Sequence, residues 1–66
     1  MEYYILHVKL IIKINDKDVP FTYINTFFEL NEAIKERKLL SMNDNIRSII
    51  LEKRILNEDG SIEPVW

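Results

Sequence analysis

Apolar and polar residues alternate along the first part of the chain. From Tyr3 to Ile14 every even position is apolar, whereas the odd positions are mixed. A period of two with one apolar face is typical of a strand that packs this face against a core. Asn15–Asp18 is a cluster of turn-forming residues, and the residues from Val19 to about Phe27 read as a second strand, with Pro20 near its start. We therefore expect a β-hairpin.

The register of this hairpin follows if the turn places Ile14 opposite Val19. The apolar face of the first strand then meets the aromatic positions of the second. The predicted pairs are Ile12 with Phe21, Leu10 with Tyr23, and Leu6 with Phe27. A slip by one residue would turn the apolar side chains to the other face, so the pattern favours this match.

A helical period follows the hairpin. Residues of one helix face recur every three or four positions, which predicts a helix that begins at Glu29 or Leu30 and ends in the segment 41–45. This face consists of Leu30, Ala33, Ile34, Arg37, Leu40 and Ser41. Arg37 disturbs it, either because its stem lies along the sheet and its guanidinium pairs with a carboxylate such as Glu52, or because the helix is shifted and Arg37 lies at the margin.

The last third of the chain predicts a second hairpin. Ile46–Leu56 reads as a strand, Asn57–Gly60 as a turn, and Ile62–Trp66 as a fourth strand. Setting Leu56 opposite Ile62 places Arg54 beside Pro64 and Glu52 beside Trp66. Both faces of this hairpin are partly apolar, so the pattern leaves open which one meets the core. The predicted fold is α+β, a single ββαββ domain over residues 1–66, with a four-stranded antiparallel sheet and one helix on one face.

Composition and charge narrow the classes of partner. The formal net charge is −2 and the pI is about 5.3, far from the pI above about 9 that is typical of nucleic-acid-binding domains. With 47% hydrophobic residues the chain is expected to fold. No apolar run approaches the roughly 20 residues of a membrane span, and Met1–Tyr4 lacks the basic start of a signal peptide. We expect a cytoplasmic protein without a membrane partner.

Catalytic and metal-binding motifs are missing from the sequence. The chain has no cysteine, one histidine and one glycine, which excludes disulfides, thiolate zinc, a multi-histidine metal site and a glycine-rich phosphate loop. The single histidine, His7, has no nucleophile in a recognisable motif, and the carboxylates cluster in turns without calcium-loop spacing. We expect no catalytic residue, no metal and no cofactor.

The predicted helix is too narrow for the predicted sheet. Four strands make a sheet roughly 19 Å wide, while one helix is about 10–12 Å across. Exposed apolar side chains of this extent usually mark an interface, so we expect a homodimer, formed by two sheet faces or by two sheet edges. The predicted partner-binding residues are Tyr3, Ile5, Ile11, Leu39, Arg47, Lys53, Arg54 and Trp66.

Two further kinds of partner follow from the same surface. Short proteins of phages and mobile elements from AT-rich bacteria look like this chain in size and in their isoleucine, lysine and asparagine content, although no diagnostic motif is present. This resemblance implies a module that binds and inhibits a larger host protein, including a defence protein.

The alternative is a nucleic-acid-binding regulator, because a sheet face with Tyr3, His7, Lys9 and Lys13 combines aromatic and cationic groups. Interleaved carboxylates disfavour it.

Overall fold

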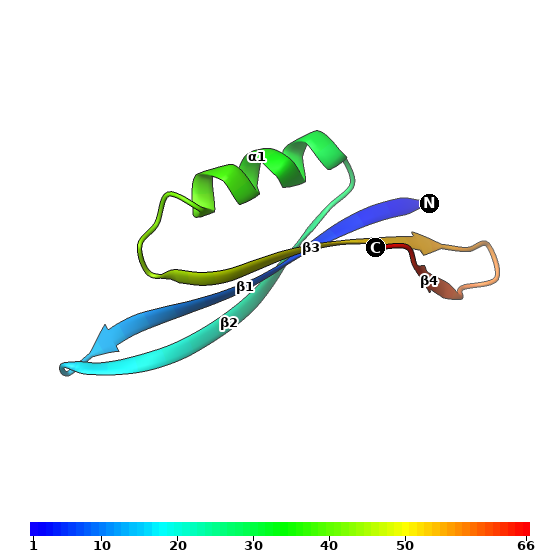
Figure 1. The fold of residues 1–66 in the computed structure, drawn as a ribbon. Helices are drawn as coiled ribbons and strands as arrows, with labels where there is room; N and C mark the ends of the chain where they lie inside the picture. The colour runs from blue at the N-terminus through cyan, green and yellow to red at the C-terminus, as the bar shows by residue number, and fades with distance from the viewer.

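The computed structural model describes residues 1–66 as one antiparallel sheet with a single helix (Figure 1). The elements are β1 (Glu2–Ile14), β2 (Lys17–Phe27), α1 (Leu30–Leu40), β3 (Ile46–Leu56) and β4 (Ile62–Pro64). The strand order is β2-β1-β3-β4, so the N-terminal strand lies in the middle of the sheet. This arrangement confirms the predicted ββαββ fold.

The β1–β2 turn is tighter than the sequence pattern predicted. Only Asn15 and Asp16 lie outside the strands, with φ values of 52° and 63°, and Ile14 pairs with Lys17. Two residues with positive φ make the short turn whose twist matches that of a hairpin. The predicted pairing of Ile14 with Val19 is therefore wrong by two residues. Because side chains alternate with a period of two, this even shift leaves every side chain on its predicted face.

Strand β3 pairs with the other side of β1. The register of this pairing shows which face of β3 meets the core. Leu6 lies opposite Leu51 and Val8 opposite Ile49, so the odd positions of β3 share the face of the even positions of β1. The pairing shifts between Lys9 and Leu10, and Arg47 is the extra residue of the resulting bulge.

The core is small and lies where α1 crosses β1. Leu6 and Ala33 are fully enclosed, and Val8 and Tyr4 are almost so. A side chain as small as that of Ala33 lets the helix approach the sheet closely at this point. Leu30 and Leu40 are half-buried beside it, on the same face of the helix. The predicted helix face thus packs on the sheet through Leu30, Ala33 and Leu40, whereas its other members, Ile34, Arg37 and Ser41, stay exposed.

Strand β4 is shorter than predicted. Leu56 pairs with Ile62 and Arg54 with Pro64, as expected, but the regular ladder ends there. Beyond Pro64, the N–H of Lys53 donates to the carbonyl of Trp66 at 2.6 Å, and the carbonyl of Lys53 accepts from the N–H of Val65 at 2.8 Å. Trp66 therefore lies beside Lys53, and its predicted position beside Glu52 is wrong.

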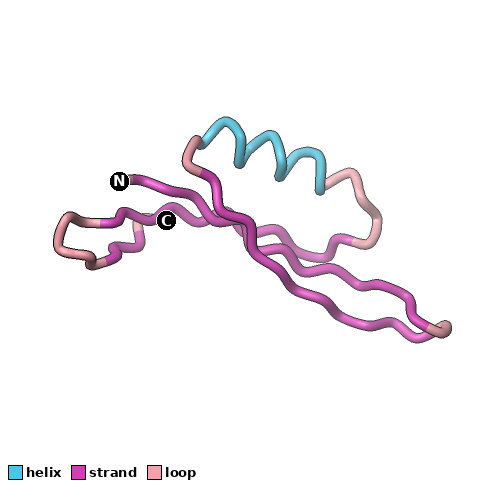
Figure 2. Tube along the Cα trace, turned by 180° about the vertical axis from the view of Figure 1, so that it is seen from behind, coloured by secondary structure: helices cyan, strands magenta, loops and turns pink.

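The molecule is elongated. Its principal extents are 49 × 21 × 14 Å, and the end of the β1–β2 hairpin projects beyond both the helix and β3 (Figure 2). The α1 helix has 11 residues, which at about 1.5 Å per residue span only a third of the long axis. The helix is also much too short to cross a membrane.

Candidate binding surfaces

The sheet face opposite α1, here called the open face, carries exposed apolar side chains. They are Ile24 on β2, Ile50 and Leu56 on β3, and Ile62 on β4. Ile24 and Ile50 flank His7 on its two sides and are 60% and 59% exposed. A hollow of about 490 Å³ lies between them, lined by His7, Val8, Lys9, Thr22, Tyr23, Ile24, Ser48 and Ile50. This face offers apolar area with no covering element.

A small charged cluster lies on the same face. The Glu52 carboxylate contacts the Arg54 guanidinium at 2.6 Å and His7 Nε2 at 3.3 Å. Since Glu52 lies on the side of the sheet away from the helix, it is out of reach of Arg37, and the hypothesis of an Arg37–Glu52 pair is wrong. Arg37 forms no ion pair and is exposed, which agrees with the other alternative, that Arg37 lies at the margin of the packed helix face.

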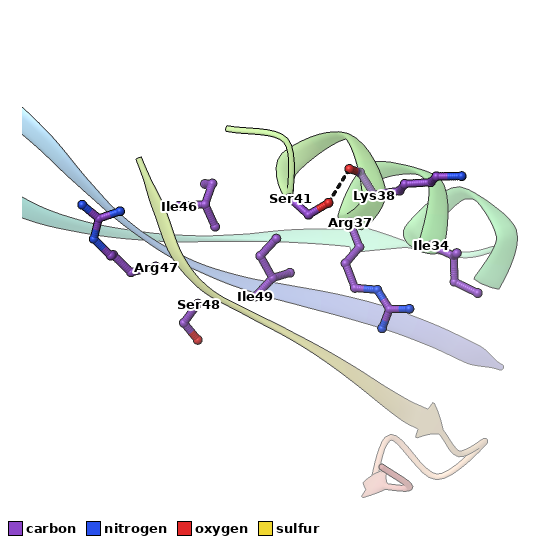
Figure 3. A pocket seen from close by; sticks show the side chains of 8 residues that line it. All are labelled: Ile34, Arg37, Lys38, Ser41, Ile46, Arg47, Ser48 and Ile49. Atoms are coloured by element: carbon purple, nitrogen blue, oxygen red, sulfur yellow. Dashed lines mark hydrogen bonds between the residues drawn. The ribbon is translucent and has the colours of Figure 1, made fainter. Parts of the chain in front are cut away.

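A groove of about 570 Å³ runs between α1 and β3 (Figure 3). Its lining consists of Ile34, Arg37, Lys38, Ser41, Ile46, Arg47, Ser48 and Ile49, which includes three cations and no carboxylate. Arg37 extends from the helix toward β3 (Figure 3), while the Arg47 guanidinium donates to the carbonyl of Asp44 at 2.7 Å. The Ser41 hydroxyl donates to the carbonyl of Lys38, also at 2.7 Å. The groove is thus cationic with an apolar floor.

The C-terminal residue is held against the first strand. The rings of Trp66 and Tyr4 lie 6.1 Å apart, and Lys53 Nζ lies 5.9 Å from the centre of the Tyr4 ring. Lys53 Nζ also contacts the Glu2 carboxylate at 3.4 Å. Tyr4 is on the helix side of the sheet, so this aromatic corner faces away from the open face.

The eight predicted partner-binding residues do not form one surface. By strand alternation Tyr3, Ile5, Ile11 and Arg54 belong to the open face, whereas Lys53 and Trp66 lie on the helix side. Leu39 is exposed on α1, and Arg47 is exposed at the bulge. Whether any of the eight contacts a partner stays a prediction.

Ile5 is the member of this set whose surroundings differ most from expectation. It is only 5% exposed, so its expected exposure is wrong. The reason is the strand order: β1 is central, and Ile5 lies between Thr26 of β2 and Glu52 of β3. A residue flanked by strands on both sides is shielded by its neighbours even where no helix covers it.

The sequence interpretation did not identify Phe21 as an exposed residue, and the predicted interface did not include Ile50 and Ile62. Phe21 is 52% exposed, because the helix ends before it can cover the projecting half of the hairpin (Figure 1). The missing information was the strand order, since alternation assigns a face to each side chain but does not reveal which strand is at an edge. The absence of charge from Phe21 to Phe27 was the available signal.

The Asp59 carboxylate is hydrogen-bonded within the turn between β3 and β4. It accepts a hydrogen bond from the Ser61 hydroxyl at 2.6 Å and from the Ser61 N–H at 2.9 Å. These bonds, the hydroxyl first, hold the pKa of Asp59 below its ordinary value of 3.8. Gly60, with φ of 89°, completes the turn. The group is fully exposed and serves the β3–β4 connection.

Comparisons of the chain with protein-family models, with curated proteins and with solved structures found no match.

Proposed function

We propose that this protein is a small non-enzymatic binding module whose exposed apolar surface is covered by a protein partner. One observation carries the proposal. Only five of the 66 residues are buried, while large apolar side chains are exposed on every element of the fold. Apolar groups left in water favour association, because burying them releases about 25 cal/mol for each Å².

The total surface supports the same conclusion. The chain exposes 5,120 Å², whereas a compact monomer of its mass would expose about 4,400 Å². Its radius of gyration is 14.3 Å, against about 11 Å for a compact domain of the same length. An isolated chain of this shape gains little from its own core, so a partner that encloses part of the surface would stabilise the fold by mass action.

The open face is the proposed site for a larger protein. Ile50, Leu56 and Ile62 offer apolar area, and Arg54 and Glu52 supply polar groups beside it. Stable interfaces commonly combine an apolar centre with a polar rim, and arginine is enriched among the residues that dominate binding energy. The expected occupant is a protein surface with an apolar patch of similar size. The resemblance to short proteins of phages and mobile elements extends the proposal to inhibition of a host protein.

The absence of catalysis is part of the proposal. His7, the single histidine, contacts Glu52, whose other partner is Arg54. A histidine that acts as general base needs a nucleophile or water beside its free nitrogen. No hydroxyl side chain is hydrogen-bonded to His7.

The groove of Figure 3 favours nucleic acid as the alternative ligand. Arg37, Lys38 and Arg47 line it without a carboxylate, which would suit a phosphate backbone. Binding of this kind weakens steeply with added salt, whereas apolar protein association changes much less. A fluorescent oligonucleotide that fails to bind at low salt and micromolar protein would overturn this alternative.

Substitution on the open face tests the main proposal. The immobilised protein is used to capture partners from a bacterial lysate, side by side with the Ile62→Glu and Met42→Glu variants. Both positions are exposed, but Met42 lies in the α1–β3 loop, away from the open face. We expect a partner that is retained by the wild type and by Met42→Glu and lost with Ile62→Glu.

Two results would overturn this function. One is a captured protein that binds Ile62→Glu as well as the wild type. The other is light scattering that returns a soluble 7.9 kDa particle at millimolar concentration together with no captured protein.

A further inference from the structure

Strand β2 is a long and unprotected edge of the sheet. It pairs with β1 on one side only, and the seven residues from Phe21 to Phe27 carry no charge (Figure 1). Exposed edges normally carry charges, prolines or bulges that prevent pairing with another chain. Here such residues, Lys17, Asp18 and Pro20, are confined to the hairpin tip.

The free hydrogen-bonding groups of β2 follow from its register. Ile14 and Lys17 flank a two-residue turn and form a hydrogen-bonded pair, and hydrogen-bonded and non-bonded pairs then alternate along the hairpin. The backbone groups of Thr22, Ile24 and Thr26 therefore point away from β1. The backbone of Pro20 also points away from β1, so the absence of its N–H removes no hydrogen bond from the β1–β2 ladder, as expected for a proline in an edge strand.

The sequence of this edge is nearly palindromic. Phe21-Thr22-Tyr23-Ile24-Asn25-Thr26-Phe27 reads similarly in both directions about Ile24. An antiparallel strand pairs its residues in reverse order. A second copy of β2 centred on Ile24 would thus pair Ile24 with Ile24, each Thr22 with Thr26, each Phe21 with Phe27, and each Tyr23 with Asn25.

We propose that two copies of this chain join along β2, antiparallel and with the two-fold axis at Ile24, into one eight-stranded sheet. The proposal rests on the proposed function as a binding module and names a second copy as one partner. Aromatic and Thr–Thr cross-strand pairs are among those that stabilise sheets. The outward backbone groups of Thr22, Ile24 and Thr26 would find partners in the same groups of the second copy.

The ends of the pairing agree with this register. Pro20, which has no N–H to offer, would lie opposite Phe28, one residue beyond the end of β2. The ladder would therefore cover residues 21–27 and stop where a donor is missing. On the helix side, Phe27 of the second copy would cover the exposed ring of Phe21.

The other edges of the sheet are less suited to pairing. Strand β4 has three residues and includes Pro64. The part of β3 that β4 leaves unpaired contains the bulge at Arg47 and ends near Glu52. Bulges and charges of this kind protect an edge. Only β2 combines length, regular pairing and lack of charge.

The Ile24→Lys and Ile50→Lys variants form a matched pair for the test. Both side chains lie on the open face beside His7 and are equally exposed, but Ile24 is on the edge strand and Ile50 is on β3. Light scattering should return twice the 7.9 kDa chain mass for the wild type and for Ile50→Lys. It should return the chain mass for Ile24→Lys, because two lysines would lie directly opposite each other.

Single cysteines test the register without depending on the folding of a charged variant. The chain has no native cysteine, and residues of a hydrogen-bonded antiparallel pair lie about 5.5 Å apart between Cα atoms, within disulfide range. Ile24→Cys should form a disulfide dimer under mild oxidation, and Ile50→Cys should not. A mixture of Thr22→Cys and Thr26→Cys should cross-link the two chains to each other more than either chain to itself.

The remaining outcomes separate this proposal from the proposed function. If Ile24→Lys and Ile50→Lys both dissociate and Ile24→Cys does not cross-link, the copies pack through their open faces and the edge proposal is overturned, while the binding function stands. A wild-type monomer that still captures a larger protein also overturns only the edge proposal. A monomer that captures nothing overturns both.

Discussion

The indole of Trp66 lies against the ring of Tyr4, with centroids 6.1 Å apart and planes inclined by 49°. This contact joins Trp66 to the first buried residue of β1, while half of the Trp66 surface stays exposed. Trp66 therefore has a structural role in addition to the predicted role in partner binding. A variant of Trp66 must accordingly be tested for stability before a loss of binding is interpreted.

Trp66→Ala is expected to lower the free energy of unfolding by more than about 1 kcal/mol, because it removes the tilted aromatic pair, which contributes about this much beyond its buried area, and the buried area as well. Urea unfolding followed by circular dichroism at fixed protein concentration measures it. Val65→Ala is the control, since Val65 is also exposed and makes no aromatic contact. Equal unfolding midpoints for the two variants would contradict the prediction.

Leu6→Ala is expected to unfold the chain. Leu6 is fully enclosed against the helix, and removal of a buried leucine side chain costs about 2–5 kcal/mol. A core of five buried residues leaves little stability to absorb this loss. The loss of far-ultraviolet circular dichroism would report it, with the exposed Leu39→Ala as control. A Leu6→Ala variant that unfolds at the wild-type midpoint would show that the helix does not pack on β1.

Asp16→Gly is expected to stabilise the β1–β2 hairpin. Asp16 has φ of 63°, a conformation that costs L-residues roughly 1–2 kcal/mol and that glycine adopts freely. Part of the gain is offset by the greater backbone entropy of glycine in the unfolded chain, which leaves up to about 1 kcal/mol. Thermal unfolding should show a higher midpoint for Asp16→Gly and a lower one for Asp16→Val. The reverse order would contradict the two-residue turn.

Ser61→Ala is expected to raise the pKa of Asp59 toward its ordinary value of 3.8, because the Ser61 hydroxyl is the main cause of the lowered pKa. The N–H of Ser61 remains, so the pKa should stay somewhat low. A carboxylate with a lowered pKa in the folded state stabilises the fold above its unfolded pKa, and this contribution is lost as pH falls through the folded pKa. The advantage of wild type over Ser61→Ala should accordingly shrink below pH 3.8.

Carbon-detected NMR titration of the Asp59 carboxyl measures this shift directly. Glu58, the neighbouring carboxylate, accepts no such hydrogen bond and serves as the internal control. An Asp59 pKa that is the same in wild type and in Ser61→Ala would contradict the assigned cause.

The sequence pattern determined each element and the core face of β1, but it left open the core face of the C-terminal hairpin and the order of the strands. Alternation from Tyr3 to Ile14 correctly assigned Leu6 and Val8 to the core, because side-chain direction in a strand is a local property. The pairing of Ile14 depended on whether the turn had two or four residues. Both lengths fit Asn15–Asp18, and the choice rests on positive φ values at Asn15 and Asp16.

Arg37 and Ile5 show the limit of local patterns for the candidate site. The pattern placed Arg37 in the middle of the packing face, but Arg37 is exposed, and its suggested partner Glu52 lies on the opposite side of the sheet. Ile5 belongs to the uncovered face and is nevertheless buried by its strand neighbours. Both outcomes depend on residues far away along the chain, which a period of two or 3.6 does not encode.

The amino-acid sequence alone determined the number and kind of elements, the two hairpins, the apolar face of β1 and the excess of apolar side chains over what one helix can cover. These properties can be read from periodicity and composition, because they depend only on residues that are close in sequence and on the total number of apolar residues. Tertiary structure decided that β1 is central, that β2 is a free edge and that Trp66 rests on Tyr4. Strand order arises from pairing between segments that are far apart in the sequence. The entropy lost on closing the loops between them opposes the hydrogen bonding and burial that the pairing gains. A local sequence pattern does not contain this balance.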